Sequence, residues 1–117
     1  MIVERRIQIP VGLEDAWMAI LDFGSWFCDK ASVAEVKPGA RAEFHWSDGS
    51  TRAAVFEEVE APRFLAFRWL PFERDPGGTP VSRPQTRVEI TLAASDDDVE
   101  IAVIERRLDG ALAEASA

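Results

Sequence analysis

The chain has 117 residues, a mass of 13.0 kDa and a formal net charge of −8 at pH 7, so it has room for one domain. Its acidic balance argues against nucleic-acid binding, which needs clustered Lys and Arg, and no stretch approaches the ~20 apolar residues of a membrane span. The single cysteine, Cys28, excludes an internal disulfide and no secretory signal is visible, so we expect a cytoplasmic protein.

The opening segments predict a strand and a helix. Residues 2–9 alternate between apolar and polar side chains, as in a half-buried strand, but Arg5 falls in the apolar row. The next apolar residues recur at helical spacing around Trp17, and Gly24 ends this helix before a second short helical turn at 25–27. We interpret the aromatic residues of this region as core packing: Trp17, Phe23, Trp26 and Phe27.

The segment 41–70 predicts three antiparallel strands, after a short strand at 32–36. In the first of the three, Phe44 and Trp46 share one face because side chains alternate along a strand. An Asp-Gly pair follows and predicts a tight hairpin turn, since glycine supplies the positive φ that such turns need.

The two strands that complete this segment differ in pattern. In the first, Glu57 lies in the same row as Ala53 and Val55. The second, at residues 64–70, is apolar on both faces apart from Arg68, so we expect it to be covered on both sides.

The last third of the chain predicts a long loop and two more strands. Residues 71–84 hold four prolines and a Gly-Gly pair, which predict an irregular, mobile loop. Residues 86–94 and 99–108 each alternate, and Glu105 continues the apolar phase of the second strand. Residues 109–117 favour a helix but are too few to form a stable one alone.

The order of these elements and several local strings resemble the START-like or SRPBCC superfamily of helix-grip domains. Within it, the chain is most similar to the branch related to the activator of the ninety-kilodalton heat-shock ATPase. The strings that carry the resemblance are VERRIQIPV at 3–11, DAWMAIL at 15–21, Trp26-Phe27, Lys37-Pro38-Gly39, the turn from Phe44 to Gly49, and FRW at 67–69.

The resemblance implies one α+β helix-grip domain over residues 1–117. It implies a curved antiparallel sheet of about seven strands with two short helices after the first strand. In this superfamily the concave side commonly takes hydrophobic ligands, and some members are enzymes. The heat-shock activator instead uses the domain as a co-chaperone surface.

The resemblance also implies a long C-terminal helix, for which residues 109–117 are too short. We expect this short tail to leave the concave face open, and uncovering some hundreds of Å² of apolar surface costs about 5–10 kcal/mol. We expect the concave face to be covered by a second copy of the chain, by another protein, or by the tail and the loop at 71–84 folding inward. We favour a homodimer.

Residues suited to nucleophilic catalysis or metal binding are few. Cys28 and His45 are single, and His45 is expected on the polar face of its strand. A Cys–His pair is therefore not expected, and neither is a metal site of three or four ligands. The sequence holds no phosphate-binding or dinucleotide motif, so we expect no cofactor.

Charges that fall in apolar rows and aromatic residues of the central strands form the candidate ligand site. The out-of-phase charges are Arg5, Glu57, Arg68 and Glu105. The candidate aromatic wall is Phe44, Trp46, Phe67 and Trp69. Buried charges need partners or a ligand, so ion pairs at strand ends and a ligand pocket are both open interpretations.

Three functions follow from this site. We predict binding of a small hydrophobic molecule on the concave face without catalysis. The alternative is a protein-interaction or co-chaperone-like domain, which rests on the family resemblance. The third is a small-molecule enzyme that uses Glu57 or Glu105 as a general acid or base.

Overall fold

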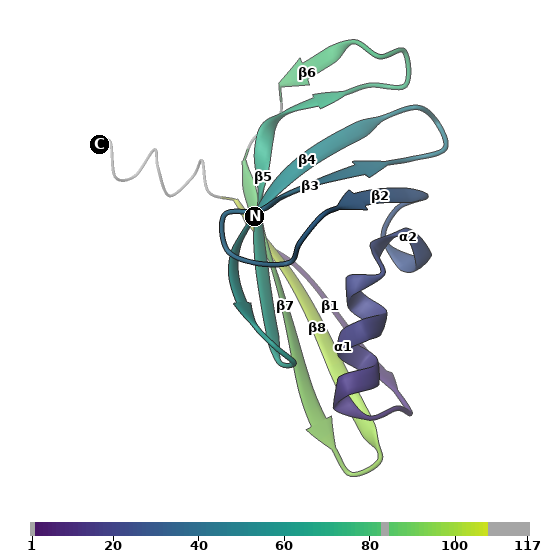
Figure 1. The fold of residues 1–117 in the computed structure, drawn as a ribbon, viewed down its shortest axis with the longest axis vertical. Helices are drawn as coiled ribbons and strands as arrows, with labels where there is room; N and C mark the ends of the chain where they lie inside the picture. Colours follow the sequence, from purple (N-terminus) through teal and green to yellow (C-terminus); the bar gives the residue numbers. More distant parts are fainter. Residues whose placement is uncertain (1, 83–84, 108–117) are drawn as a thin grey trace, which may run out of the picture.

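The computed structural model describes residues 2–82 and 85–107, which form one antiparallel sheet with two short helices (Figure 1). The strands are β1 (Ile2–Ile9), β2 (Lys30–Val33), β3 (Arg41–His45), β4 (Thr51–Glu60), β5 (Phe64–Arg74), β6 (Pro80–Ser82), β7 (Thr86–Ser95) and β8 (Asp98–Arg107). The helices are α1 (Leu13–Leu21) and α2 (Phe23–Trp26). Glu14 and Asp15 lie in the first turn of α1, where the helix dipole favours acidic groups.

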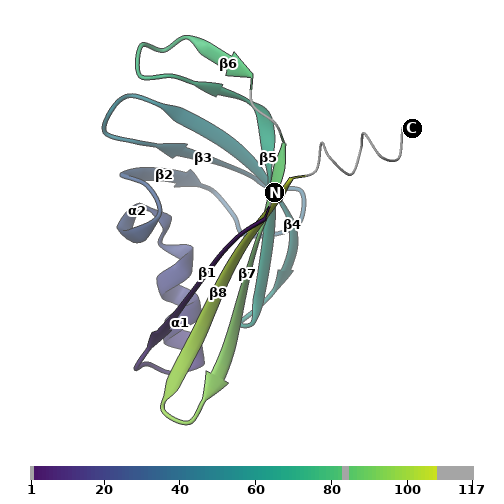
Figure 2. The ribbon, with the colours of Figure 1, turned by 180° about the vertical axis from the view of Figure 1, so that it is seen from behind.

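The strands lie side by side in the order β1-β8-β7-β5-β4-β3-β2, and β6 pairs with the end of β5. Every pair is antiparallel. The sheet is strongly curved, and α1 and α2 lie on its concave side (Figures 1 and 2). These observations confirm the predicted α+β class, the curved antiparallel sheet and the two short helices after the first strand.

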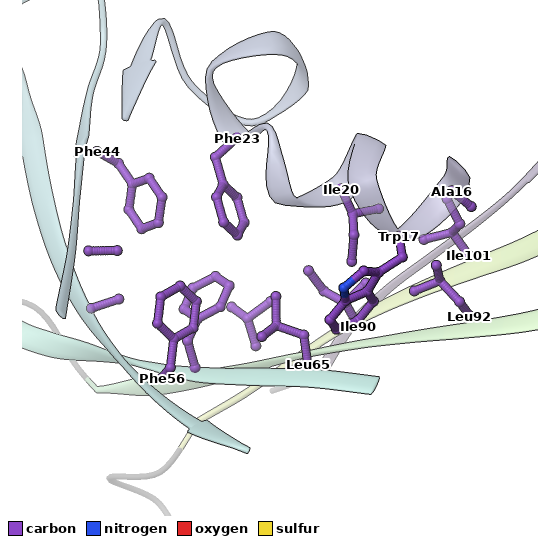
Figure 3. Packing of buried hydrophobic residues seen from close by; sticks show 14 of the residues in the cluster. Ala16, Trp17, Ile20, Phe23, Phe44, Phe56, Leu65, Ile90, Leu92 and Ile101 are labelled. Carbon is purple, nitrogen blue, oxygen red and sulfur yellow. The ribbon is translucent and has the colours of Figure 1, made fainter. Parts of the chain in front are cut away.

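The core fills the space between the concave face and the helices. Phe23 of α2 is only 1% exposed, and its ring centroid lies 5.3 Å from that of Phe44 and 6.3 Å from those of Phe56 and Phe67. Helix α1 adds a buried stripe to the same cluster (Figure 3), made of Ala16, Trp17 and Ile20. The prediction that Trp17 and Phe23 belong to the core is confirmed.

The expectation of an irregular loop at residues 71–84 is wrong for the described part of that segment. Strand β5 continues to Arg74, and its end pairs with β6 to form a hairpin. The Asp75 carboxylate closes the turn by accepting hydrogen bonds from the N–H groups of Gly77 and Thr79, at 3.0 and 2.9 Å. Pro80 fits here because β6 pairs only with β5 within the described residues, and such an edge strand needs no backbone donor on its outer side.

Two further outcomes concern the ends of elements. The strand expected at 32–36 begins earlier and occupies Lys30–Val33. Leu108 and the expected tail at 109–117 lie outside the described residues. No helix in the described ranges is both long and apolar enough to cross a membrane.

Candidate functional site

A cavity of about 680 Å³ opens on the concave face beside α2. Its floor consists of β5, β7 and β8, which contribute Trp69, Val88, Ile101 and Val103. Helix α2 and the residue after it form one wall, and β1 and the β3–β4 hairpin contribute the rim. A mostly apolar cavity of this size is typical of a small-molecule site.

The aromatic wall of the pocket contains two of the four predicted residues. Trp46 and Trp69 line the cavity, and Trp69 is almost fully buried. Phe44 and Phe67 are buried in the layer beneath, with their ring centroids 5.4 and 5.2 Å from that of Trp69. They support the wall from behind, since rings in edge-to-face contact fix each other's orientation.

Two further aromatic residues of the wall come from the helical segment, and sequence reasoning assigned them to the core. Phe27 stacks on Trp69 with the ring planes 14° apart and the centroids separated by 5.9 Å. The Trp26 indole N–H donates a hydrogen bond to the Ile20 carbonyl at 2.9 Å, while the residue as a whole remains 42% exposed at the rim. Their aromatic side chains indicated core packing, but the sequence could not show that they meet a cavity rather than solid core.

Arg5 and Glu105 line the same pocket at its β1–β8 end. In the antiparallel register Arg5 lies opposite Val103, two residues from Glu105, so both charged side chains project from the concave face of neighbouring strands. The Thr86 hydroxyl donates a hydrogen bond to the Glu105 carboxylate at 2.5 Å. The structure therefore brings two of the four out-of-phase charges together.

Glu57 and Arg68 lie on the opposite, convex face and do not line this pocket. The Arg68 Nε lies 3.2 Å from the Glu57 carboxylate, and the Arg87 Nε lies 3.2 Å from its other oxygen. Arg87 also pairs with Glu89, at 3.2 Å. These side chains form a row of ion pairs across β4, β5 and β7, which matches the ion-pair interpretation of these two charges.

The placement of Glu57 corrects an expectation about β4. Its buried row contains Ala54 and Phe56, whereas the row of Ala53 and Val55, in which Glu57 was expected to be out of phase, faces outward. Both rows of this strand contain apolar residues, so alternation alone left the choice open. The large Phe56 ring, which packs into the core, was the signal for the correct face.

The other end of the pocket contains charged residues that sequence reasoning missed. The Arg52 guanidinium lies over the Trp69 ring, 4.0 Å from its centroid, and its Nε lies 3.1 Å from the Glu73 carboxylate. Arg52 shares the row of Ala54 and Phe56, and this spacing could have identified it. Glu73 was hidden because its segment was predicted to be a loop.

Asp48 also lies at this end and is held by its own turn. Its carboxylate accepts hydrogen bonds from the hydroxyl and the N–H of Ser50, at 2.6 and 2.8 Å. These bonds favour the charged form and lower the pKa of Asp48.

The candidate nucleophile does not face this pocket. The Cys28 thiol donates to the carbonyl oxygens of Lys30 and Phe23, at 3.3 and 3.6 Å, and burial raises the pKa of Cys28. A raised pKa keeps the sulfur in its unreactive thiol form at neutral pH. His45 lines a separate cavity of about 170 Å³. Within the described ranges, no three His, Cys, Asp or Glu side chains are placed to hold a metal ion.

Comparison with protein families identifies the domain. The family model described as activator of Hsp90 ATPase homolog 1-like protein matches residues 13–116. The chain belongs to this family. The resemblance stated from the sequence strings is thereby confirmed. No curated protein sequence matches the chain.

Comparison with solved structures supports the START-like fold. The chain aligns with MLL2253 from Mesorhizobium loti at a TM-score of 0.76 and 18% identity, over 92% of this chain and 77% of that one. It aligns with the Aha1 dimer from Colwellia psychrerythraea at 0.71 and 13%, over 92% and 76%. DynU16, from the dynemicin biosynthetic locus, aligns at 0.73 and 21%, but this chain spans only 37% of its length. At these identities the likeness shows the fold.

Proposed function

We propose that this domain binds a small hydrophobic molecule in the concave pocket without transforming it. The observation that carries the proposal is the cavity of about 680 Å³, whose floor and walls are aromatic and aliphatic and whose charged groups lie at its two ends. Apolar walls supply affinity in such sites, and a few polar groups orient the ligand. The family membership supports the same class of function.

The exposure of apolar side chains at the rim supports this proposal. Ile7 is 56% exposed and Trp26 is 42% exposed, and both line the pocket. A bound apolar molecule covers such surface, which contributes about 25 cal/mol for each Å² removed from water.

A neutral dye tests the proposal. We expect N-phenyl-1-naphthylamine to bind with saturable fluorescence enhancement, and we expect Val103→Phe, which fills the floor, to weaken binding several-fold. The matched control is Ile104→Phe, the adjacent residue on the outer face of β8, which is expected to leave binding unchanged. Absence of saturable dye binding to the unaltered protein, or an equal loss in both variants, would contradict a ligand site here.

A protein partner is the second candidate, and the same rim favours it. Exposed Ile7 and Trp26 offer apolar surface to another chain as well as to a ligand, and one related structure is described as a dimer. We propose a second copy of this chain as that partner. Sedimentation equilibrium at micromolar concentration is expected to show a dimer that Ile7→Glu dissociates, while Met18→Glu, on the outer side of α1, does not. A monomer at all concentrations would exclude it.

Neither a chaperone partner nor a cytoplasmic location is tested by the structure, and both stay predictions. Of the two carboxylates weighed for catalysis, Glu105 lines the pocket and Glu57 faces away from it. The enzymatic alternative therefore now depends on Glu105.

A further inference from the structure

We infer that the ligand of this pocket is an amphipathic anion whose charged group binds the Arg5 guanidinium. Its apolar body then lies against the aromatic wall that contains Trp46 and Trp69. This inference rests on the proposed ligand-binding function and adds the chemical class of the ligand.

The first argument comes from the charged residues that line the pocket. These are Arg5, Asp48, Arg52, Glu73 and Glu105. Arg52 pairs with Glu73, the Asp48 carboxylate accepts two hydrogen bonds from Ser50, and the Glu105 carboxylate accepts one from Thr86. Within the described ranges, no side chain forms an ion pair or hydrogen bond with the Arg5 guanidinium. Arg5 is thus the charged group of the pocket that is left for a ligand.

The second argument comes from the position of Arg5 in the strand. It occupies the concave row of β1 together with Ile7 and Ile9, where an aliphatic residue would add to the apolar surface. The neighbouring Arg6, on the outer face, is instead paired with Glu4 and Glu100, at 2.7 and 2.9 Å. Two adjacent arginines therefore have different surroundings, and only the one at the pocket lacks an acidic partner within the described ranges.

The chemistry of guanidinium favours an oxyanion as the group that binds it. Its planar fork of N–H donors matches the two oxygens of a carboxylate, and such paired, charge-assisted hydrogen bonds are stronger than neutral ones. Between the charged groups at its two ends, the cavity is lined by apolar residues, among them Phe27, Trp69 and Val88. A carboxylate joined to a hydrocarbon chain or ring system matches both the Arg5 guanidinium and the apolar walls.

The charge of Glu105 allows a second test of the inference, because its effect on an anionic ligand is opposite to that of Arg5. The Glu105 carboxylate projects from the next strand, two residues along from the partner of Arg5, and repels a bound anion. The two charges therefore have opposite predicted effects. Removing the Arg5 charge weakens binding of an anion, and removing the Glu105 charge strengthens it. A cationic ligand would reverse both signs.

Displacement of the neutral dye by decanoate, decanol and decylamine at pH 7.5 tests the inference, because the three probes share one tail. We expect decanoate to bind about five- to tenfold more tightly than decanol, a range set by charge-assisted bonding at a partly exposed site. Arg5→Gln should remove this advantage and leave decanol binding unchanged, and Arg5→Lys should retain part of it. Glu105→Gln should tighten decanoate binding about two- to threefold.

Arg6→Gln is the matched control, since it removes the same charge from the outer face one residue away, and decanoate binding should be unchanged. Equal affinities for decanoate and decanol, or the tightest binding by decylamine with loss in Glu105→Gln, would overturn this inference while leaving the pocket as a ligand site. If the dye itself does not bind, the proposed function and this inference both fall.

Discussion

The guanidinium carbon of Arg52 lies 4.0 Å from the centroid of the Trp69 ring, and the same group forms an ion pair with Glu73 at 3.1 Å. Both partners of the ion pair are largely shielded from water, with side-chain exposures of 23% and 14%. This arrangement joins β4 to the end of β5 where their pairing shifts register, and it forms one end of the pocket.

Replacing Arg52 by Met, which keeps the aliphatic stem, should reduce the free energy of unfolding by about 1–2 kcal/mol. The loss combines the cation–π contact with the cost of leaving the Glu73 carboxylate shielded and without this partner. Urea unfolding followed by tryptophan fluorescence measures it. Lys37→Met is the control, because the pair of Lys37 with Glu35 is well exposed and should contribute nothing measurable. Equal effects of the two variants would contradict the assignment.

Phe23 should be the residue on which docking of α2 depends. Phe23→Ala removes a ring that packs against Phe44, Phe56 and Phe67, and such truncations cost about 3–5 kcal/mol. Because α2 and the residue after it supply one wall of the pocket, the milder Phe23→Leu should also weaken dye binding. Met18→Ala, at a residue 65% exposed on α1, should change neither quantity. Unchanged dye binding in Phe23→Leu would contradict the prediction that the pocket depends on the docking of α2.

Gly49 and Gly39 together separate backbone strain from steric clash. Both have positive φ, at 94° and 89°, but a Cβ on Gly49 would lie 2.7 Å from the Pro76 carbonyl oxygen, whereas none of the heavy atoms described lies within 4 Å of a Cβ on Gly39. Gly39→Ala should therefore cost only the strain of positive φ, about 1 kcal/mol. Gly49→Ala should cost about 1 kcal/mol more, because the two hairpin tips must move apart. Thermal unfolding of both variants measures the difference in stability cost. Equal costs would mean that the two hairpin tips move apart without a measurable loss of stability.

The Cys28 thiol should react slowly and at unusually high pH. Burial raises the pKa of Cys28 in the folded protein, so the neutral thiol is the favoured form. The stabilisation linked to this group is therefore fully present below the pKa of the unfolded chain and is lost as pH rises through the higher folded pKa. Iodoacetamide alkylation as a function of pH should show a midpoint above that of the same protein in urea. A midpoint at or below the urea value would contradict the burial of this thiol.

Alternation along single strands was enough to assign several faces of the sheet. It placed Phe44 of β3 and Trp46, the residue after β3, on one face, and it marked Arg5 and Glu105 as charges within inward rows. The structure places all four as expected, because in β1, β3 and β8 one row is clearly more apolar than the other. Local patterns along the chain predicted the order of a strand, two short helices and then further antiparallel strands, and the structure confirms this order.

Three features were decided only by tertiary structure. In β4 both rows are apolar, and the docking of Phe23 against Phe56 determined which row is buried and so turned Glu57 outward. The proline-rich segment became a strand because the end of β5 offered it an edge. The pocket itself exists because curvature brings Arg5 on one edge strand and Trp46 near the other to a common cavity. The local alternation of apolar and polar residues indicates which residues share a face of a strand. Long-range strand pairing and the curvature of the sheet determine which other residues pack against that face.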